Sequence, residues 1–376
     1  MVTDMAKYRI ALLPGDGIGK EVMEAAQLVL ERIALDAEYV PADIGWEFWC
    51  REGDALPQRT LETLKSCTCA LFAAITSKPR EEAEAELAPE LRGKGLVYQS
   101  PIVRLRQQFD LYINMRPCRS FKGNPLNFRD DIDLVIFREN TQDLYAGVEF
   151  HPLPEEVRLA LERHSRGMVA FKDTPSDEIA ISCRILTVEG CRRIIRAAFE
   201  YARKHGYPTV TLVEKPNVIR ATSGMMVHEA RKIAALYPEI ELWEANVDAM
   251  AMWLVKNPQK YGVLVSSNMF GDIISDLAAQ LVGGLGFAPG GNIGDGFAIF
   301  EPTHGSAPKH AGLYRANPIA MLLAVRMMLD WLDEAEAGAA LERAIAQVIA
   351  EGRVRTYDMG GHSTTLDMAR AVAERL

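Results

Sequence analysis

The stretch YRIALLPGDGIGKEVMEAAQLVLERIAL, residues 8–35, decides the fold class. It begins with an apolar, strand-like run, which is followed by three glycines, Gly15, Gly17 and Gly19. A helical pattern starts near residue 21, with apolar side chains on one face. A strand that passes through a glycine turn into a helix opens many α/β nucleotide-binding proteins. The turn is therefore a candidate phosphate loop.

The spacing of these glycines does not fit the dinucleotide fingerprint. That fingerprint has glycine at its first, third and sixth places, and Lys20 stands at the sixth place after Gly15. It also needs an acidic residue about 20 positions further on, and Asp36 and Glu38 are common residue types there. A tight turn without any ligand explains the glycines as well.

The rest of the chain repeats this alternation of strand and helix patterns. A long helical pattern covers residues 187–206. Short β-rich runs occur at residues 69–76, 133–137, 209–214 and 261–267. We therefore predict an α/β protein whose sheet is covered by helices on both faces.

Two stretches depart from this alternation. Residues 80–98 are charged and interrupted, which predicts a surface helix or loop over a cleft. Residues 283–317 contain the densest glycine content, and we expect them to form an irregular binding loop.

Length and charge limit the function classes. A chain of 376 residues forms one large or two ordinary domains. The net charge of −9 opposes non-specific binding to nucleic acid, which needs a basic face. The N-terminus has no basic-then-apolar leader and no apolar run reaches membrane-spanning length, so we expect a cytoplasmic protein without a membrane partner. The six cysteines fit neither a zinc site nor a disulfide framework.

Arginines at the ends of predicted elements indicate an anionic substrate. Ser100 and Pro101 mark the start of a helix that carries Arg106. Arg116 follows a strand-like run, and Arg138 ends another. Guanidinium groups bind carboxylates in a bidentate manner, so their convergence would imply a di- or tricarboxylate substrate. Each arginine could instead be a solvated surface charge.

A pair of aspartates suggests a metal site. Asp272 and Asp276 are four residues apart in a helical pattern, so both carboxylates lie on one face. A divalent cation would relieve their repulsion, and oxygen ligands favour Mg²⁺ or Mn²⁺. The alternative is a helix start in which acidic residues complement the dipole. Asp248 is a possible third carboxylate.

Five motifs together resemble one known family. They are YINMRP, IFRENTQDLYAGVE, EKPNV, SSNMFGDIISDLAAQLVGGLGFAPGGNIG and EPTHGSAPKHAG. In this order they resemble the metal-dependent β-decarboxylating dehydrogenases, which include isocitrate, homoisocitrate, 3-isopropylmalate and tartrate dehydrogenases. The likeness runs from PGDGIGKEV to a C-terminal TYDMGGHSTTLDM and so covers nearly the whole chain.

The resemblance implies an isopropylmalate/isocitrate dehydrogenase-like α/β fold that is not of the Rossmann type. A large α/β domain would contain residues 1–112 and 282–376, with the cofactor loop at 285–317. A smaller α/β dimerisation domain would contain residues 113–281, with a clasp near 140–180. The clasp and the smaller domain would form a homodimer whose active sites take residues from both subunits.

The matched motifs also imply roles for residues around the substrate. Tyr145 would be the general acid that protonates the carbon left after CO₂ departs. Lys215 would act across the dimer interface in the proton transfer at the hydroxyl, and Asn217 would support the substrate and nicotinamide. The substrate carboxylates would be bound by Ser100, Arg106, Arg116 and Arg138.

The same resemblance implies the metal and cofactor sites. Asp272 and Asp276 would hold Mg²⁺ or Mn²⁺ together with Asp248 of the partner subunit, which we also count among the catalytic residues. Thr76 and Ser77 would lie beside the nicotinamide. The cofactor loop would be formed by Glu301, His304, Gly305, Ser306, Ala307, Lys309, His310 and Asn317.

The motifs favour isocitrate as substrate, converted to 2-oxoglutarate and CO₂, with homoisocitrate, 3-isopropylmalate or tartrate as alternatives. Ile102 stands where the isocitrate pattern has asparagine, and Arg104 could reach a more distant carboxylate. Lys309 suits the 2′-phosphate of NADP better than the ribose hydroxyls of NAD, so we favour NADP. A non-catalytic regulatory subunit of a hetero-oligomer is the alternative from another class.

Overall fold

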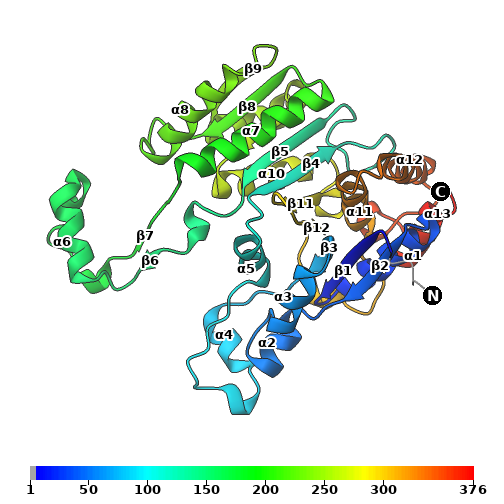
Figure 1. The fold of residues 1–376 in the computed structure, drawn as a ribbon, viewed down its shortest axis with the longest axis horizontal. Helices are drawn as coiled ribbons and strands as arrows, with labels where there is room; N and C mark the ends of the chain where they lie inside the picture. The colour runs from blue at the N-terminus through cyan, green and yellow to red at the C-terminus, as the bar shows by residue number, and fades with distance from the viewer. Residues whose placement is uncertain (1–5) are drawn as a thin grey trace.

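The computed structural model describes residues 6–376; the first five residues of the predicted large domain lie outside the described part. Its framework is one ten-stranded sheet with the order β2-β1-β3-β12-β11-β4-β5-β10-β8-β9 (Figure 1). The ten strands are β1 Tyr8–Gly15, β2 Ala37–Pro41, β3 Cys69–Ala74, β4 Ile113–Arg119, β5 Asp133–Glu139, β8 Thr209–Glu214, β9 Glu241–Asn246, β10 Val263–Ser266, β11 Pro289–Ile293 and β12 Ala298–Pro302.

The sheet contains two parallel blocks joined by antiparallel strands. In one block β2, β1, β3 and β12 run parallel, and in the other β5, β10, β8 and β9 do so. Between them β11 and β4 pair antiparallel with each other and with their outer neighbours. This order confirms the predicted fold class, an α/β sheet that differs from the Rossmann order.

Helices cover both faces of the sheet. The longer helices are α1 Gly19–Ile33, α2 Trp46–Glu52, α3 Gln58–Lys65, α4 Arg80–Ala85, α5 Pro101–Gln108, α6 Glu155–His164, α7 Val188–His205, α8 Thr222–Ala234, α9 Val247–Lys256, α10 Asn268–Leu281, α11 Ile319–Trp331, α12 Ala335–Glu351 and α13 Thr365–Ala373. Apolar cores place α1, α7, α8 and α11 to α13 on one face, and α3, α5, α9 and α10 on the other. None of these helices, within residues 6–376, is long and apolar enough to cross a bilayer.

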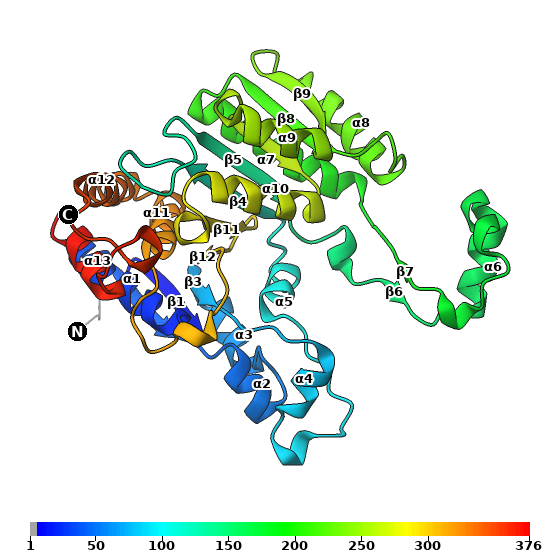
Figure 2. The same ribbon diagram turned by 180° about the vertical axis from the view of Figure 1, so that it is seen from behind.

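The two chain ends build one core together. Helices α1 and α13 lie side by side in both views (Figures 1 and 2), and their apolar faces join those of α11 and α12 against β1, β3 and β12. The middle of the chain supplies separate cores around α7 and α10. The division into two domains at residues 112 and 282 stays a prediction, because one sheet runs through both parts.

The glycine-rich stretch is more regular than we expected. Within it, residues 289–293 and 298–302 form the largely buried strands β11 and β12 instead of an irregular loop. At Gly291 β11 packs closely against its neighbours: a Cβ there would lie 3.1 Å from the Met327 methyl group and 3.3 Å from the Phe300 ring, so these side chains would have to shift slightly. The irregular loop therefore begins only after Pro302.

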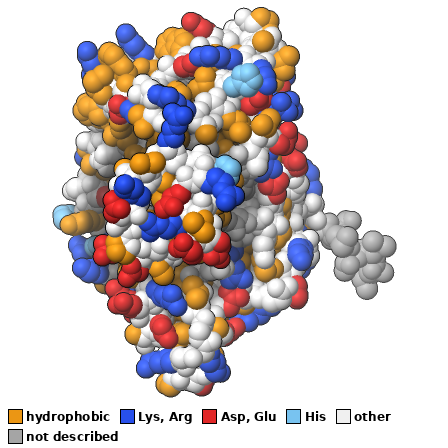
Figure 3. Space-filling view, turned by 90° about the vertical axis from the view of Figure 1, so that its left-hand side faces the viewer, with side chains coloured by type: hydrophobic (Ala, Val, Ile, Leu, Met, Phe, Trp, Pro, Cys, Tyr) orange, Lys and Arg blue, Asp and Glu red, His pale blue; other side chains and the backbone are white. Residues whose placement is uncertain are grey.

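Two segments stand away from the sheet. The predicted clasp contains the short antiparallel pair β6 Glu149–Phe150 and β7 Ile181–Ser182, and it carries α6 far from the body of the protein (Figures 1 and 2). Residues 80–98 contain the predicted surface helix, α4, whose Ala83 packs against Trp49 of α2. On the face shown in Figure 3, acidic and basic side chains are interspersed.

The opening glycine turn holds the N-terminal strand against two other loops. Gly15 and Gly17 have φ angles of +63° and +56°. A Cβ on Gly15 would lie 1.9 Å from the carbonyl oxygen of Ala74, and one on Gly17 would lie 2.1 Å from that of Ser306. The glycines therefore allow the turn to pack closely against the end of β3 and the loop after β12. This agrees with their spacing, which does not fit the dinucleotide fingerprint.

This packing predicts unequal costs for two glycine substitutions. Gly206 also has a positive φ, +72°, but a Cβ at this position would meet no atom of residues 6–376 within 4 Å. We expect Gly206→Ala to lose about 1–2 kcal/mol of unfolding free energy from the left-handed backbone alone. Gly17→Ala should lose about 1–3 kcal/mol more because of the clash. Urea unfolding measures both, and equal losses would contradict the close approach.

Candidate active site

Two of the predicted substrate arginines project from neighbouring strands. Arg116 lies inside β4 and not just after a strand as we predicted, because β4 continues to Arg119. Arg138 lies on β5 opposite Asn114, two residues before Arg116. Since side chains alternate along strands, both arginines leave the sheet on the face that α10 covers. Arg116 is 8% exposed and Arg138 is 1% exposed.

Arg106 reaches the same region from α5. Its Nε donates to Asn292 Oδ1 at 2.8 Å and its Nη2 to Glu301 Oε1 at 3.3 Å. Burial lowers the pKa of Arg106, and the charge of Glu301 opposes this shift. Glu301 was predicted in the cofactor loop, but it lies in β12 and is buried, because the strand extends to Pro302. The structure brings Glu301 to the arginines.

The two aspartates of α10 meet these arginines. Arg138 Nη1 donates to Asp272 Oδ1, and Arg116 Nη1 donates to Asp276 Oδ1 at 3.0 Å. The phenol of Tyr145, in the short 3-10 helix Leu144–Ala146, donates to Asp272 Oδ2 at 2.6 Å. One site therefore joins arginines, carboxylates and a phenol from four separate elements.

The surroundings set the protonation of these groups. Burial raises the pKa of Asp272, but the charges of Arg138 and Arg116 outweigh burial, so the net shift is downward. Burial raises the pKa of Asp276, and the charge of Asp272 adds to this effect. Burial, with the hydrogen bond to Asp272, raises the pKa of Tyr145. Tyr145 therefore stays a neutral phenol that can give up a proton.

One donor in this site has no partner. Arg138 Nη2 is buried and makes no hydrogen bond within residues 6–376. Leaving a charged donor unpaired in the interior is costly. A ligand with an anionic oxygen would satisfy it.

Asp272 and Asp276 fit a divalent metal by the chemistry of their donors. Both offer carboxylate oxygens from one helix face, and the Asp276 side chain is 59% exposed. Within residues 6–376, however, no three acidic, histidine or cysteine side chains are arranged as a metal site. Asp248 of the same chain thus does not complete the predicted set of three ligands.

The other predicted catalytic residues form a separate group. Lys215 follows β8, and its Nζ binds Asp248 Oδ1 at 2.5 Å in the first turn of α9. The hydrogen bond from Lys215 lowers the pKa of Asp248. Asn217 is exposed two residues after Lys215. The site is divided into two halves, one at α10 and one at the ends of β8 and β9.

The predicted nicotinamide side is built on the opening turn. The buried carboxylate of Asp16 accepts the N–H of Trp46 and of Thr76, both at 2.8 Å. Thr76 Oγ1 lies 2.7 Å from Ser306 Oγ, which brings the loop after β12 to the end of β3. Ser77 Oγ lies 3.3 Å from the hydroxyl of Tyr98. Asp16 and Tyr98 thus belong to this region, although sequence reasoning missed them.

A cavity of about 210 Å³ lies under the same loop. Among the predicted cofactor residues it is lined by His304, Ala307, His310 and Asn317. His304 Nε2 is buried and makes no hydrogen bond within residues 6–376, and burial lowers the pKa of this imidazole. Gly305 and Lys309 are exposed on the loop.

The cavity also contains residues that we did not predict to bind. The Arg315 guanidinium lies over the Tyr357 ring, 5.1 Å from its centroid, and Asp358 accepts from Asn317 and Thr356. In the sequence, only the TYD motif near the C-terminus indicated that this side of the cavity could bind a ligand.

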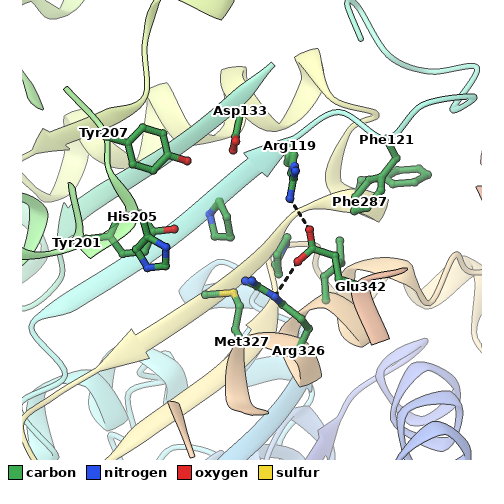
Figure 4. Close-up of a pocket in the computed structure, with 13 residues that line it drawn as sticks. Arg119, Phe121, Asp133, Tyr201, His205, Tyr207, Phe287, Arg326, Met327 and Glu342 are labelled. Carbon is green, nitrogen blue, oxygen red and sulfur yellow. Dashed lines mark hydrogen bonds and ion pairs between the residues drawn. The ribbon is translucent and has the colours of Figure 1, made fainter. Parts of the chain in front are cut away.

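A second, larger cavity lies behind the site. Its volume is about 280 Å³, and Figure 4 shows it between α7 and α11. Pro117 and Arg119 of β4 face this cavity, whereas Arg116 faces α10. In Figure 4, Glu342 joins Arg119 and Arg326 by ion pairs. None of the predicted site residues lines it.

Comparison with known families agrees with this geometry. The family model described as isocitrate/isopropylmalate dehydrogenase matches residues 9–372. The chain belongs to this family. Its members are decarboxylating dehydrogenases that depend on NAD(P) and a divalent metal.

Relatives in the family carry different substrate names. A 3-isopropylmalate dehydrogenase of Methanothermobacter thermautotrophicus is 42% identical over 99% of both chains. An isocitrate/homoisocitrate dehydrogenase of Thermus thermophilus is 40% identical over 98% of both. Protein DlpA of Legionella pneumophila is 43% identical over 97% of this chain, which spans only 58% of DlpA. The crystal structure of isocitrate dehydrogenase from Methylococcus capsulatus superposes with a TM-score of 0.84, at 38% identity, over 98% of this chain and 99% of that one.

The metal assignment predicts the effect of neutralising one ligand. Loss of even an outer contact of a metal site costs about 10–100-fold in affinity, so Asp276→Asn should weaken Mn²⁺ binding at least tenfold. Electron paramagnetic resonance of free Mn²⁺ measures this directly, without turnover. Glu336→Gln removes the same charge from an exposed position on α12 and should leave binding unchanged. Equal Mn²⁺ affinity in all three proteins would remove Asp276 from the site.

Proposed function

We propose that this chain catalyses the oxidative decarboxylation of a 3-substituted malate. The observation that carries the proposal is the buried Nη2 of Arg138, beside Asp272 and Tyr145, which makes no hydrogen bond to any residue of the described part, 6–376. A substrate carboxylate would accept a hydrogen bond from this donor. Arg106 and Arg116 would bind a second carboxylate of the same substrate. All the catalytic residue types of an active family member are present, which favours an enzyme over a regulatory subunit.

The chain's own residues account for binding and for the proton steps. Removing hydride from a 2-hydroxy acid requires a base at the hydroxyl, and Lys215 is suited to move that proton. The C–C bond to the departing carboxylate then breaks, and Tyr145 gives its proton to the remaining carbon. When bound, the divalent metal would polarise the oxygen of the reacting carbon, and NAD(P) would accept the hydride.

A homodimer would unite the two halves of the site. Met252 and Val255 of α9 and Ile273 of α10 are large apolar residues that are about half exposed, on helices that pack together. Such a patch is typical of a protein interface. Because Asp248 is on α9 and Asp272 is on α10, a second copy docked on this patch would bring Asp248 and Lys215 to the metal ligands. This arrangement would account for the separation, within one chain, of Asp248 from Asp272 and Asp276.

The substrate's variable group is expected to meet α5. Ser100, Val103 and Arg106 are three residues apart and share one helix face. Arg104 points elsewhere and forms an ion pair with Asp54, so it is not free for a distant carboxylate. The aliphatic Val103 beside Arg106 favours a 3-alkylmalate such as 3-isopropylmalate, which moves this substrate ahead of isocitrate.

Isocitrate remains the second candidate because of Ser100. This serine occupies the N-cap position of α5, but its hydroxyl makes no capping hydrogen bond. A free hydroxyl at a helix N-terminus suits the additional carboxylate of isocitrate.

The cofactor side favours NADP. Lys309 and His310 are exposed on the loop, and Arg315 lines the same cavity, with no ion pair to any of the three within residues 6–376. The one acidic residue of the lining, Asp358, already accepts from Asn317 and Thr356. Unpaired cations suit a 2′-phosphate.

Initial rates test the function and its substrate. Isocitrate, homoisocitrate, 3-isopropylmalate, tartrate and malate are each assayed with NAD and NADP, with and without Mn²⁺. We expect 3-isopropylmalate to give the highest kcat/KM. Val103→Ala should lower that value about tenfold through lost contact with the alkyl group, whereas Ser100→Ala should affect isocitrate alone. Absence of turnover with every diacid, or turnover after complete metal removal, would refute the proposal.

Binding of nucleotide fragments tests the cofactor. Adenosine 2′,5′-bisphosphate should bind more tightly than 5′-AMP in calorimetry. Lys309→Asp should weaken the bisphosphate about 10–100-fold, because hydrogen bonds between charged groups contribute about 1.5–3 kcal/mol. The exposed Arg343→Ala on α12 is the matched control and should change nothing. Equal affinity for the two nucleotides would instead favour NAD.

A further inference from the structure

Arg184 occupies a junction beneath the site that no predicted role includes. It lies where the clasp returns to the body, between β7 and α7, and its side chain is only 10% exposed. Its guanidinium joins segments that are distant in sequence. The partners are Asp143 Oδ1 at 2.6 Å, Ser223 Oγ at 2.8 Å, Thr222 Oγ1 at 3.2 Å, Glu214 Oε2 at 3.2 Å, and Ser267 Oγ.

The first branch of this junction supports the segment of Tyr145. Asp143 is fully buried, two residues before Tyr145, and has a φ of +70° that is unusual for aspartate. Its second carboxylate oxygen accepts the N–H of Met269 in the first turn of α10, at 3.0 Å. The ion pair with Arg184 thus holds the strained turn that directs the Tyr145 phenol toward Asp272.

The second branch supports the segment of Lys215. Glu214 is the last residue of β8, is 1% exposed, and directly precedes Lys215. Its carboxylate also accepts from Ser223 Oγ at 2.6 Å and from the N–H of Ser267 at 2.9 Å. The guanidinium therefore fixes the end of the strand from which Lys215 projects.

Both carboxylates depend on the same cation. Burial lowers the pKa of Arg184, but Glu214 and Asp143 outweigh this effect and raise it, so the guanidinium stays charged. A planar group with five donors can bind two carboxylates and neighbouring hydroxyls at once, which an ammonium cannot. No other side chain in residues 6–376 has a hydrogen bond to both Asp143 and Glu214.

We propose that Arg184 is a positioning residue for two active sites at once. It holds Tyr145 for the site of its own chain and Lys215 for the site of the second copy in the dimer. The inference rests on the proposed function, in which each site takes Tyr145 from one copy and Lys215 from the other. A single buried guanidinium then links the two sites of the dimer.

Hybrid dimers can separate these two roles. One chain carries Tyr145→Phe and the other Lys215→Met, with different tags for purification. One site of this hybrid then has both defects, and the other has neither. Because the two sites of a symmetric dimer are equivalent, the hybrid should retain about half of the wild-type kcat, whereas each mutant homodimer is inactive. An inactive hybrid would overturn the shared site itself, and so would identify failure of the proposed function.

Arg184→Gln is then placed in one chain at a time. In the Tyr145→Phe chain, it disturbs only the Lys215 that serves the intact site. In the Lys215→Met chain, it disturbs only the Tyr145 of that site. We expect both hybrids to lose about 10–100-fold in kcat, since small misplacements of reacting groups have effects of this size. Loss in only one of the two hybrids, or in neither, would overturn the double role.

Further readouts distinguish positioning from general stability. KM for the diacid and Mn²⁺ affinity should stay near their wild-type values, since Arg106, Arg116 and Asp276 are untouched. Arg192 of α7 has a more exposed side chain and forms an ion pair with Glu229 of α8, and Arg192→Gln, which breaks this pair, should keep full activity. If Arg184→Gln does not fold, Arg184→Lys keeps the charge and tests the same two hybrids. A parallel loss of kcat, diacid binding and Mn²⁺ binding would reduce Arg184 to a structural residue.

Discussion

Three buried guanidinium groups are the constraint on which the rest of this structure depends. Arg106, Arg116 and Arg138 are each less than 10% exposed, and a buried charge is tolerated only when it is paired and hydrogen-bonded. Each forms an ion pair with a carboxylate from another element: Arg106 with Glu301 of β12, Arg116 with Asp276 of α10, and Arg138 with Asp272 of α10. These ion pairs connect α5 to β12, and β4 and β5 to α10.

Much of this arrangement could be predicted from the sequence. Apolar runs and helical periodicity gave correct positions for β1, β8 and α7, because buried parallel strands and amphipathic helices have distinct patterns. Arg116 and Arg138 could be found because they adjoin apolar, strand-like runs, and Arg106 because Ser100 and Pro101 mark the start of its helix. The two aspartates of α10 were identified by their spacing on one face.

The rest depends on contacts that leave no local pattern. β11 contains two glycines and was predicted as a loop, and only its pairing with β12 and β4, which are distant or irregular in the sequence pattern, makes it a strand. For the same reason Glu301 was predicted in the cofactor loop, whereas the structure places it in β12 beside Arg106. Within one chain, Asp248 lies with Lys215 and not with the predicted metal ligands Asp272 and Asp276. Arg184 gave no signal, because its partners come from four segments between residues 143 and 267.

The position of α5 has a consequence for how the enzyme could acquire new specificities. The strand arginines Arg116 and Arg138 are held by ion pairs with Asp272 and Asp276 of α10, so changes there disturb several elements at once. The exposed side of α5 carries few such obligations, since its buried residues are Pro101, Leu105 and Arg106. If the proposed function holds, directed evolution aimed at Ser100 and Val103 would therefore vary side-chain size and polarity at the substrate while Tyr145, Lys215 and the strand arginines stay in place.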